Sequence, residues 1–283
     1  MNFGCKTALK KFFKQYGLRP AKRLGQNFLI DKVAVRKIIE AADLTPADTV
    51  LEIGPGPGVL TQELTKRVKK VIAVEKDPKM VEILKETLKD FENIKIIHGD
   101  IRISDFPNID NRKSDIQKYK VVGNLPFYLA APVIRQFLEN TGVQPLYLVL
   151  VVQKEVGKRI CAKPPKMNLL AVSVQVYAEP KIISYISKES FWPAPKVDAA
   201  ILKISNLKSQ ISKLNRDLFF KIVRAGFSQP RKQLLNNMAN GLKLNKEVAK
   251  SWLLKNNIQP TQRAERLSVE NWINLTKTFV LPR

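Results

Sequence analysis

The segment VVGNLPFYLA, residues 121–130, places an amide, a proline and an aromatic ring directly after an apolar run. Such a run is typical of a buried strand, and an open α/β sheet binds its ligand where its strands end. The Asn124 side-chain oxygen and the Leu125 carbonyl could each accept an N–H from one amine of a ligand and orient it. Pro126 would stiffen the turn, and Phe127 would offer a face on which a ring could stack. The segment therefore predicts a ligand that needs an amide next to a ring, against the alternative of a strand-end turn with a core phenylalanine.

A glycine-rich turn, EIGPGPGVLT, follows an earlier apolar run and allows the backbone to approach a ligand closely. Its glycines are Gly54, Gly56 and Gly58. The spacing is G-x-G-x-G, whereas dinucleotide-binding enzymes use G-x-G-x-x-G. Pro55 and Pro57 also remove two backbone donors, which makes the turn a poor cradle for a pyrophosphate. Glu52, just before the turn, could order the loop or meet a cationic amine.

Polar side chains end the apolar runs that follow the glycine turn. Glu75 lies about 20 residues past the glycines, where an acid can hold both hydroxyls of a ribose. Asp100 follows the next run and could accept from an adenine amine, and Asn124 ends the run after that. This set matches S-adenosylmethionine better than a nicotinamide cofactor. The structural alternatives are an ion pair of Glu75 with Lys76 or Lys79 and a turn role for Asp100.

Apolar, β-branched runs alternate with stretches of helical spacing through most of the chain. Runs this apolar indicate strands buried on both faces, and the alternation indicates a parallel sheet with right-handed crossovers. The last two runs have little helix between them and indicate an antiparallel pair at one edge. We predict an α/β, Rossmann-like, seven-stranded sheet, mostly parallel with one antiparallel edge pairing, in a catalytic domain over residues 1–205. The runs are 49–53, 71–75, 94–98, 119–123, 146–152, 169–178 and 197–204.

Amphipathic helical runs replace the strands after Ile204 and predict a small all-helical domain over residues 206–283. Ser268 is a candidate N-cap for the last helix. Two domains fit a chain of 283 residues, on a prior of roughly 150 residues per domain. The helical runs lie near 215–225, 230–240, 246–256 and 268–279.

Basic residues dominate the charge, with 49 Lys and Arg against 25 Asp and Glu, a net of +24. This excess favours a polyanionic partner, with nucleic acid ahead of an anionic membrane, over a general lysine enrichment of the genome. Phosphate contacts of this kind give an affinity that falls steeply as salt is raised. We assign them to Lys196, Arg224, Arg231 and Lys232.

Cysteine and histidine are too scarce for a metal centre or a disulfide scaffold. Cys5 and Cys161 form no C-x-x-C, which fits a reducing cytoplasm, and His98, the only histidine, is expected to be structural. No apolar run is long enough to span a bilayer. The first residues lack the core of a secretory signal, and a basic surface helix is favoured there over a targeting segment. We therefore expect a cytoplasmic protein without a metal.

Seven motifs together resemble the KsgA-type small-subunit ribosomal RNA adenine dimethyltransferases, over nearly the whole chain. Asn-Leu-Pro-Phe resembles the N/D-x-P-F/Y motif of methyltransferases that act on nucleobase amines. The resemblance implies the methyltransferase sheet with a small helical domain, S-adenosylmethionine as cofactor and S-adenosylhomocysteine as product. The motifs are RLGQNFLID (23–31), EIGPGPGVLT (52–61), VIAVEKD (71–77), HGDI (98–101), VVGNLPF (121–127), FWPAPKVDAAI (191–201) and FSQPRKQLLNNM (227–238).

The resemblance also implies a role for each matching residue. Asn124 through Phe127 would bind the target adenine, and Phe191 would stack on its other face. The reaction would be two methyl transfers to each of two adjacent adenosines near the 3′ end of small-subunit (16S) rRNA, within an immature 30S particle. The cofactor would be held by Asn27, Leu29, Gly54, Gly56, Glu75, Lys76, Asp100, Ile101 and Asn124.

The sequence departs from the family's pattern at three places, and two alternative functions remain to be distinguished. Phe127 stands where tyrosine is more frequent, Pro230-Arg231 where paired arginines are frequent, and AKPPKMNLLAV lacks an expected Tyr-Gly. A macrolide-resistance methyltransferase of large-subunit rRNA would share the catalytic motifs, although FWPAPKVD favours the small-subunit enzyme. An assembly-checkpoint factor would depend on binding rather than catalysis. DNA is disfavoured because no separate target-recognition domain is visible, and a monomer is expected.

Overall fold

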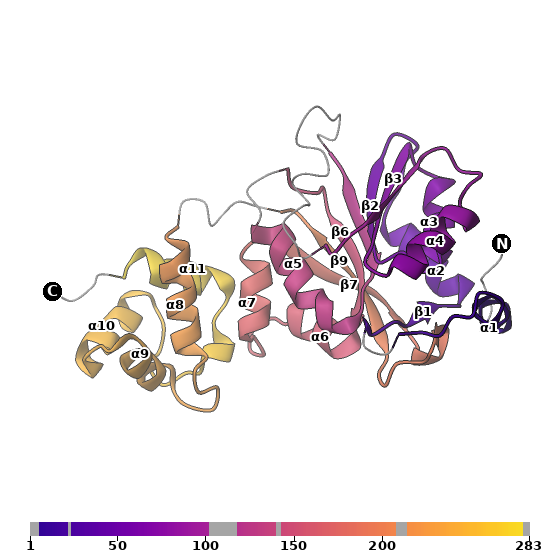
Figure 1. Ribbon diagram of the computed structural model, residues 1–283. Helices are drawn as coiled ribbons and strands as arrows, with labels where there is room; N and C mark the ends of the chain where they lie inside the picture. Colours follow the sequence, from indigo (N-terminus) through magenta and orange to yellow (C-terminus); the bar gives the residue numbers. More distant parts are fainter. Residues whose placement is uncertain (1–5, 22–23, 102–117, 140–142, 208–213, 280–283) are drawn as a thin grey trace. The chain divides into compact units, whose positions relative to one another are not determined.

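Two compact units make up the chain, and each combines separate stretches of the sequence. The first unit joins Met1–Gly157 with Lys181–Leu207, and the second joins Lys158–Pro180 with Lys208–Arg283 (Figure 1). Cys5 and Arg23 lie outside the described residues. The computed structural model describes residues 6–21, 24–101, 118–139, 143–207 and 214–279.

A seven-stranded sheet forms the core of the first unit, in the order β4-β3-β2-β5-β6-β9-β7 (Figure 1). The pairs β2–β3, β3–β4, β2–β5 and β5–β6 are parallel, and β6–β9 is antiparallel. This confirms the predicted, mostly parallel Rossmann-like sheet. The order reverses at β2, and such a switch point is where open α/β sheets bind ligands. The strands are β2 Thr49–Ile53, β3 Lys70–Glu75, β4 Ile94–His98, β5 Lys120–Asn124, β6 Leu148–Gln153, β7 Glu179–Ile186 and β9 Ala199–Ser205.

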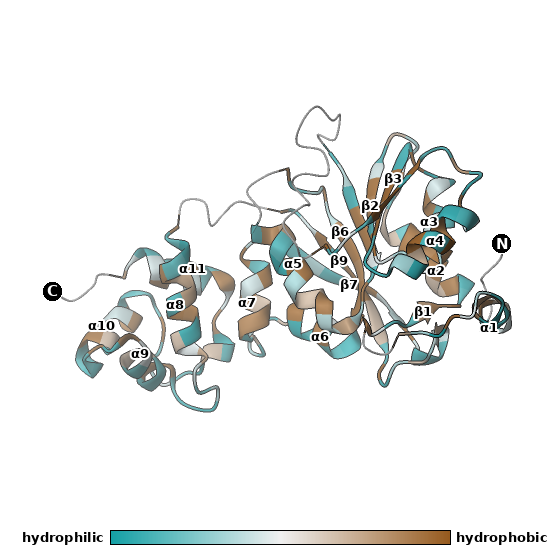
Figure 2. Ribbon diagram, in the orientation of Figure 1, coloured by the Kyte–Doolittle hydropathy of each residue, from teal (hydrophilic) through white to brown (hydrophobic). Residues whose placement is uncertain are grey.

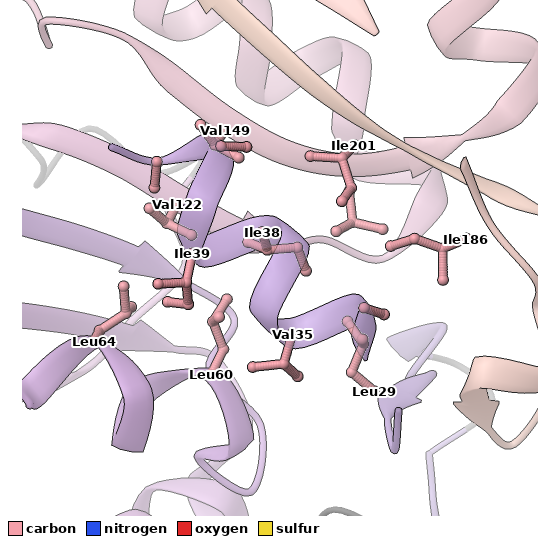
Figure 3. Close-up of a cluster of buried hydrophobic side chains, with 14 of the residues drawn as sticks. Leu29, Val35, Ile38, Ile39, Leu60, Leu64, Val122, Val149, Ile186 and Ile201 are labelled. Carbon is pink, nitrogen blue, oxygen red and sulfur yellow. The ribbon is translucent and has the colours of Figure 1, made fainter. Parts of the chain in front are cut away.

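Amphipathic helices connect these strands and bury their apolar side chains against the sheet. Figure 3 shows Ile38 of α2 and Leu64 of α3 in one buried cluster with Val122, Val149 and Ile201 from the strands. Burying each such side chain stabilises the fold by roughly 1.5–3 kcal/mol. In Figure 2 the strands carry many brown, hydrophobic residues and the helices show both colours, as amphipathic helices do. The helices are α1 Lys6–Gln15, α2 Lys32–Ala41, α3 Val59–Thr65, α4 Pro78–Thr87, α5 Ala130–Glu139 and, across the unit boundary, α6 Lys154–Ile160.

The predicted strand over 169–178 is wrong, because this segment forms helix α7, Leu169–Gln175. Asn168 caps the helix by accepting from the Ala171 N–H at 3.1 Å. The alternation of valines with Ser173 and Gln175 has the period of a strand although the segment is helical. The edge strand is instead β7, in which exposed and half-buried residues alternate. Polar residues and Pro180 made that strand weak as a sequence signal.

Among the described residues of the second unit, the regular structure is helical apart from Glu179 and Pro180 at the start of β7, and α7 belongs to this unit. Residues 158–180 therefore group with the C-terminal helices, whereas the sequence assigns them to the catalytic domain. The four predicted C-terminal helices are present, and Ser268 caps the last one in a capping box with Asn271. None of the described helices, in either unit, has the length and apolarity needed to cross a membrane. The C-terminal helices are α8 Arg216–Gly226, α9 Leu234–Leu242, α10 Lys246–Lys255 and α11 Val269–Lys277.

Close packing of α8 against α11 gives the first testable prediction. A Cβ added at Gly226 would lie 2.3 Å from Cη2 of Trp272, a ring that is fully buried. Replacing Gly226 with alanine should therefore destabilise the second unit by about 2 kcal/mol, in the range of other overpacked cores. Thermal unfolding followed by circular dichroism would show the loss as a midpoint lowered by several degrees. Ser251→Ala, at an exposed position of α10, is the matched control and should leave the midpoint unchanged.

Candidate active site

One cavity in the first unit collects the predicted cofactor and target residues at the carboxyl ends of β2, β3 and β5. The N-terminal segment Leu24–Leu29 forms another wall of this cavity. All twelve residues assigned from the sequence to the cofactor or the target amine line this cavity, so the ends of these strands meet at one place. They are Asn27, Leu29, Gly54, Gly56, Glu75, Lys76, Asp100, Ile101, Asn124, Leu125, Pro126 and Phe127.

The glycine turn adopts the backbone conformation that its sequence predicts. Gly54, Gly56 and Gly58 have φ values of +66°, +56° and +87°, a region that side chains with a Cβ rarely enter. A Cβ at Gly56 would also lie 2.9 Å from Cε1 of Phe28, so only glycine fits beneath that ring. The Gly56 N–H donates to Oε2 of Glu75 at 3.0 Å, which ties the turn to the end of β3.

Two acidic side chains occupy the ends of β3 and β4. Glu75 is buried, and its Oε1 accepts from the Asp77 N–H at 2.9 Å. Burial raises the pKa of the Glu75 carboxyl, although the backbone N–H groups of Asp77 and Gly56 oppose the effect. Nζ of Lys76 lies 2.8 Å from Oδ2 of Asp100. Lys76, which the sequence offered as an ion-pair partner of Glu75, therefore pairs with Asp100. The Ile101 carbonyl beside it accepts from the Gln136 side chain at 2.7 Å, which fixes this rim against α5.

The Asn124 side chain is held with its nitrogen toward the N-terminal segment. Its Nδ2 donates to the Asn27 carbonyl at 3.0 Å. Since a carbonyl can only accept, this contact fixes which end of the amide carries the oxygen. The Asn27 side chain in turn donates to the Gly25 carbonyl at 3.1 Å. Oδ1 of Asn124 is thereby left as the acceptor of the amide, as the sequence argument requires.

Gln26 was not predicted from the sequence, and it fastens the N-terminal segment to the sheet side of the cavity. Its Nε2 donates to Oδ2 of Asp77 at 2.8 Å, and its Oε1 accepts from the Ala21 N–H at 2.8 Å. Asp77 also caps α4 through the Lys79 N–H. The sequence Gly-Gln-Asn-Phe, with two amide residues after a glycine, was the only local sign of a role for Gln26. Its partner Asp77 lies 51 residues further along the chain, so the contact could not be predicted from the sequence.

The residues predicted to contact RNA are divided between the two units. Phe191 is only 2% exposed, pairs with Leu29 in the small β1–β8 ribbon, and belongs to the buried core. It does not line the cavity, so the structure does not bring it to the site as the predicted stacking partner. Lys196 is exposed on the first unit. Arg224, Arg231 and Lys232 are exposed on the second. The ribbon strands are β1 Phe28–Leu29 and β8 Phe191–Trp192.

A buried carboxyl with one unsatisfied oxygen forms part of the cavity lining. Glu52 is 1% exposed and lines the cavity, and among the described residues its Oε2 has no hydrogen-bond partner. Burial raises the pKa of the Glu52 carboxyl to about 8; the nearby Thr61 hydroxyl opposes this effect, and the charge of Glu75 adds to it. Leaving such a group unsatisfied is costly, which suits a site that receives a cationic group from a ligand.

Glu52 also gives a prediction on stability. Its folded-state pKa of about 8 exceeds its ordinary value of 4.5, so between these pH values only the unfolded chain releases the proton. Raising the pH therefore destabilises the ligand-free protein, by up to about 1.4 kcal/mol per pH unit. Glutamine cannot ionise, so Glu52→Gln should be more stable than the wild type at pH 8, by roughly 3 kcal/mol, and nearly similar at pH 5.

Urea unfolding of the ligand-free protein at the two pH values measures this difference. Glu82→Gln, an exposed position on α4, should unfold like the wild type at both. Equal pH dependence in the wild type and in Glu52→Gln would contradict the account of the buried carboxyl.

Comparison with known proteins assigns the chain to a family. The model of the family described as ribosomal RNA adenine dimethylase matches residues 18–280. The chain belongs to this ribosomal RNA adenine dimethylase family. A relative from Dehalococcoides mccartyi, named ribosomal RNA small subunit methyltransferase A, is 44% identical over 94% of this chain and 90% of its own.

Solved structures of similar proteins agree with the assignment of the chain to this family. A dimethyladenosine transferase from Plasmodium falciparum has a TM-score of 0.72 at 26% identity, over 88% of this chain and 95% of its own. The 23S rRNA methyltransferase ErmE has a TM-score of 0.69 at 23% identity, over 89% of this chain and 98% of its own, and shows the shared fold alone. Proteins with different names thus share this fold, so the fold alone does not identify the RNA target.

Membership of the family makes the chain an S-adenosylmethionine-dependent rRNA methyltransferase, as the motifs predicted. The polar groups that line the cavity suit the charged and polar groups of that cofactor. The partnerless Oε2 of Glu52 suits an ammonium group, and the carboxylates of Glu75 and Asp100 suit hydroxyl and amino groups. Among the described residues, no group of three or more His, Cys, Asp and Glu side chains is placed to hold a metal ion.

Proposed function

We propose that this enzyme dimethylates two adjacent adenosines near the 3′ end of small-subunit (16S) rRNA. The substrate would be an immature 30S particle in the cytoplasm, and the enzyme would act as a monomer on RNA rather than DNA. The 44% identity to a small-subunit methyltransferase and the FWPAPKVD segment support this target over large-subunit rRNA. The observation that carries the proposal is the Asn124 amide, held by the Asn27 carbonyl with its oxygen end available to an amine.

The cofactor would lie along the ends of β2, β3 and β4. Glu52 would face its ammonium group, Glu75 its ribose hydroxyls and Asp100 its adenine amine, with Lys76 holding Asp100 in place. Asn27, Leu29, Gly54, Gly56 and Ile101 would complete the walls. The bound cofactor supplies a methyl group activated by a sulfonium.

The loop after β5 would prepare the target amine. The amine lone pair of adenine is delocalised into its ring, so the nitrogen is a weak nucleophile. Two acceptors, Oδ1 of Asn124 and the Leu125 carbonyl, would each bind one N–H and draw the nitrogen toward pyramidal geometry, so that its lone pair faces the methyl group. Pro126 keeps both acceptors preset, and Phe127 offers a face to the flipped base. After transfer, the methylated nitrogen loses one proton to water.

Affinity for the particle would come from basic residues on both units. The net charge of +24 and the exposed Lys196, Arg224, Arg231 and Lys232 support a broad phosphate footprint. We assign the helical region 206–283 to rRNA binding. Such contacts are largely independent of sequence, so the choice of target would depend on RNA shape and on which bases can turn out.

Mass spectrometry of rRNA digests tests the proposal directly. The enzyme is incubated with isotope-labelled cofactor and with either small or large subunits purified from cells that lack this methylation. We expect dimethyladenosine at two adjacent positions of the small-subunit rRNA and no label in large-subunit rRNA. Label in large-subunit rRNA alone would overturn the proposed target and favour the macrolide-resistance activity.

A further inference from the structure

An exposed aromatic ring forms part of the cavity wall beside the catalytic loop. Tyr128 is 53% exposed and lines the cavity. It follows Phe127 in the short 3-10 helix η3, Phe127–Leu129, in which successive side chains point about 120° apart. Phe127 packs against the buried core and Leu129 is itself buried. Tyr128 is therefore the residue of this turn that faces outward at the cavity.

The N-terminal segment lies beside one edge of this ring. Gly25 has a φ of +63°, and a Cβ there would lie 3.2 Å from Cε1 and 3.4 Å from Cδ1 of Tyr128. It would also lie 3.4 Å from Cβ of Pro126. The bare backbone of Gly25 thus rests against one part of the ring, and the rest stays accessible. A ring that is already ordered loses little side-chain entropy when a partner binds it.

We propose that Tyr128 stacks on the unpaired base next to the adenine that enters the cavity. The inference rests on the proposed function, in which the targets are two adjacent adenosines. Turning one base into the cavity removes the stacking partner of its neighbour. A fixed aromatic ring at the cavity wall replaces that contact, because every base has a face that can stack on an aromatic side chain. The ligand of Tyr128 is thus a neighbouring nucleobase of the same RNA strand.

A cycle of protein and RNA changes tests this contact. Small subunits are rebuilt with rRNA in which one of the two adenosines is either intact or replaced by an abasic nucleotide, and methylation of the other is followed. With intact rRNA, Tyr128→Ala should lower kcat/KM by about 5- to 100-fold, the range expected for one lost stacking contact. Tyr128→Phe, which keeps the ring, should stay within twofold of the wild type. With abasic rRNA, the wild type and Tyr128→Ala should react at the same rate.

Two controls separate this role from a structural one. Binding of S-adenosylhomocysteine, measured by calorimetry, should be unchanged in Tyr128→Ala. Tyr185→Ala removes a similarly exposed tyrosine, 48% accessible on β7, and should leave kcat/KM unchanged. Equal rates for the wild type and Tyr128→Ala on intact particles would overturn the inference alone. An equal loss for Tyr128→Ala on abasic particles would also overturn it. Absence of transfer by the wild type to intact particles would instead overturn the proposed function, and the inference with it.

Discussion

Replacing Asn124 with alanine is expected to lower kcat for methyl transfer by about 100- to 1000-fold, the usual cost of removing one preset polar contact to a reacting group. The variant lacks the side-chain acceptor that the Asn27 carbonyl orients, so only the Leu125 carbonyl is left to polarise the amine. Asn124 also lines the cofactor cavity, but in the proposed mechanism the acids make the main polar contacts with the cofactor, so affinity for S-adenosylhomocysteine should fall far less than kcat. Single-turnover methylation of unmethylated small subunits and calorimetry measure the two quantities separately.

The matched control is Asn245→Ala, which removes an asparagine that caps α10 in the second unit. This change should reduce stability by about 1 kcal/mol and leave kcat unchanged. Small subunits should bind Asn124→Ala as tightly as the wild type, since the phosphate contacts proposed above involve other residues. A kcat within threefold of the wild type would refute the assigned role of Asn124. Normal maturation of small subunits in cells carrying only Asn124→Ala would show that binding, rather than methyl transfer, serves assembly.

Glu75→Ala should weaken the binding of S-adenosylhomocysteine by at least about 100-fold. A hydrogen bond to a charged group contributes about 1.5–3 kcal/mol, and two ribose hydroxyls would bind this carboxylate. The variant also removes the acceptor for the Gly56 and Asp77 N–H groups, so the glycine turn loses its tie to β3. Titration calorimetry gives the dissociation constant.

The control for Glu75→Ala is Glu82→Ala, which removes an exposed carboxylate on α4, the helix that follows β3 in the chain. Its dissociation constant should match that of the wild type. An affinity of Glu75→Ala within fivefold of the wild type would remove Glu75 from the ribose site. In that case the carboxylate would serve only to order the turn.

The sequence predicts the sheet and the rim of the cavity because both are local signals. Apolar runs mark the strands, and the polar residues that end them, Glu75, Asp100 and Asn124, do line one cavity. The helix over 169–175 was mistaken for a strand because Ser173 and Gln175 alternate with valines and so imitate the two-residue period of a strand. Side-chain environments that depend on distant segments could not be predicted. Among them are the link from Gln26 to Asp77 and the burial of Phe191.

The β1–β8 ribbon joins the N-terminal wall of the cavity to residues near position 191. During synthesis, Phe28 and Leu29 leave the ribosome long before Phe191 and Trp192 exist. A nascent chain shorter than about two thirds of the protein therefore lacks the strand that pairs with Phe28 and Leu29, and its cavity wall depends on contacts such as that of Gln26 with Asp77. The newly made protein gains the ribbon as a support for this wall only late in translation.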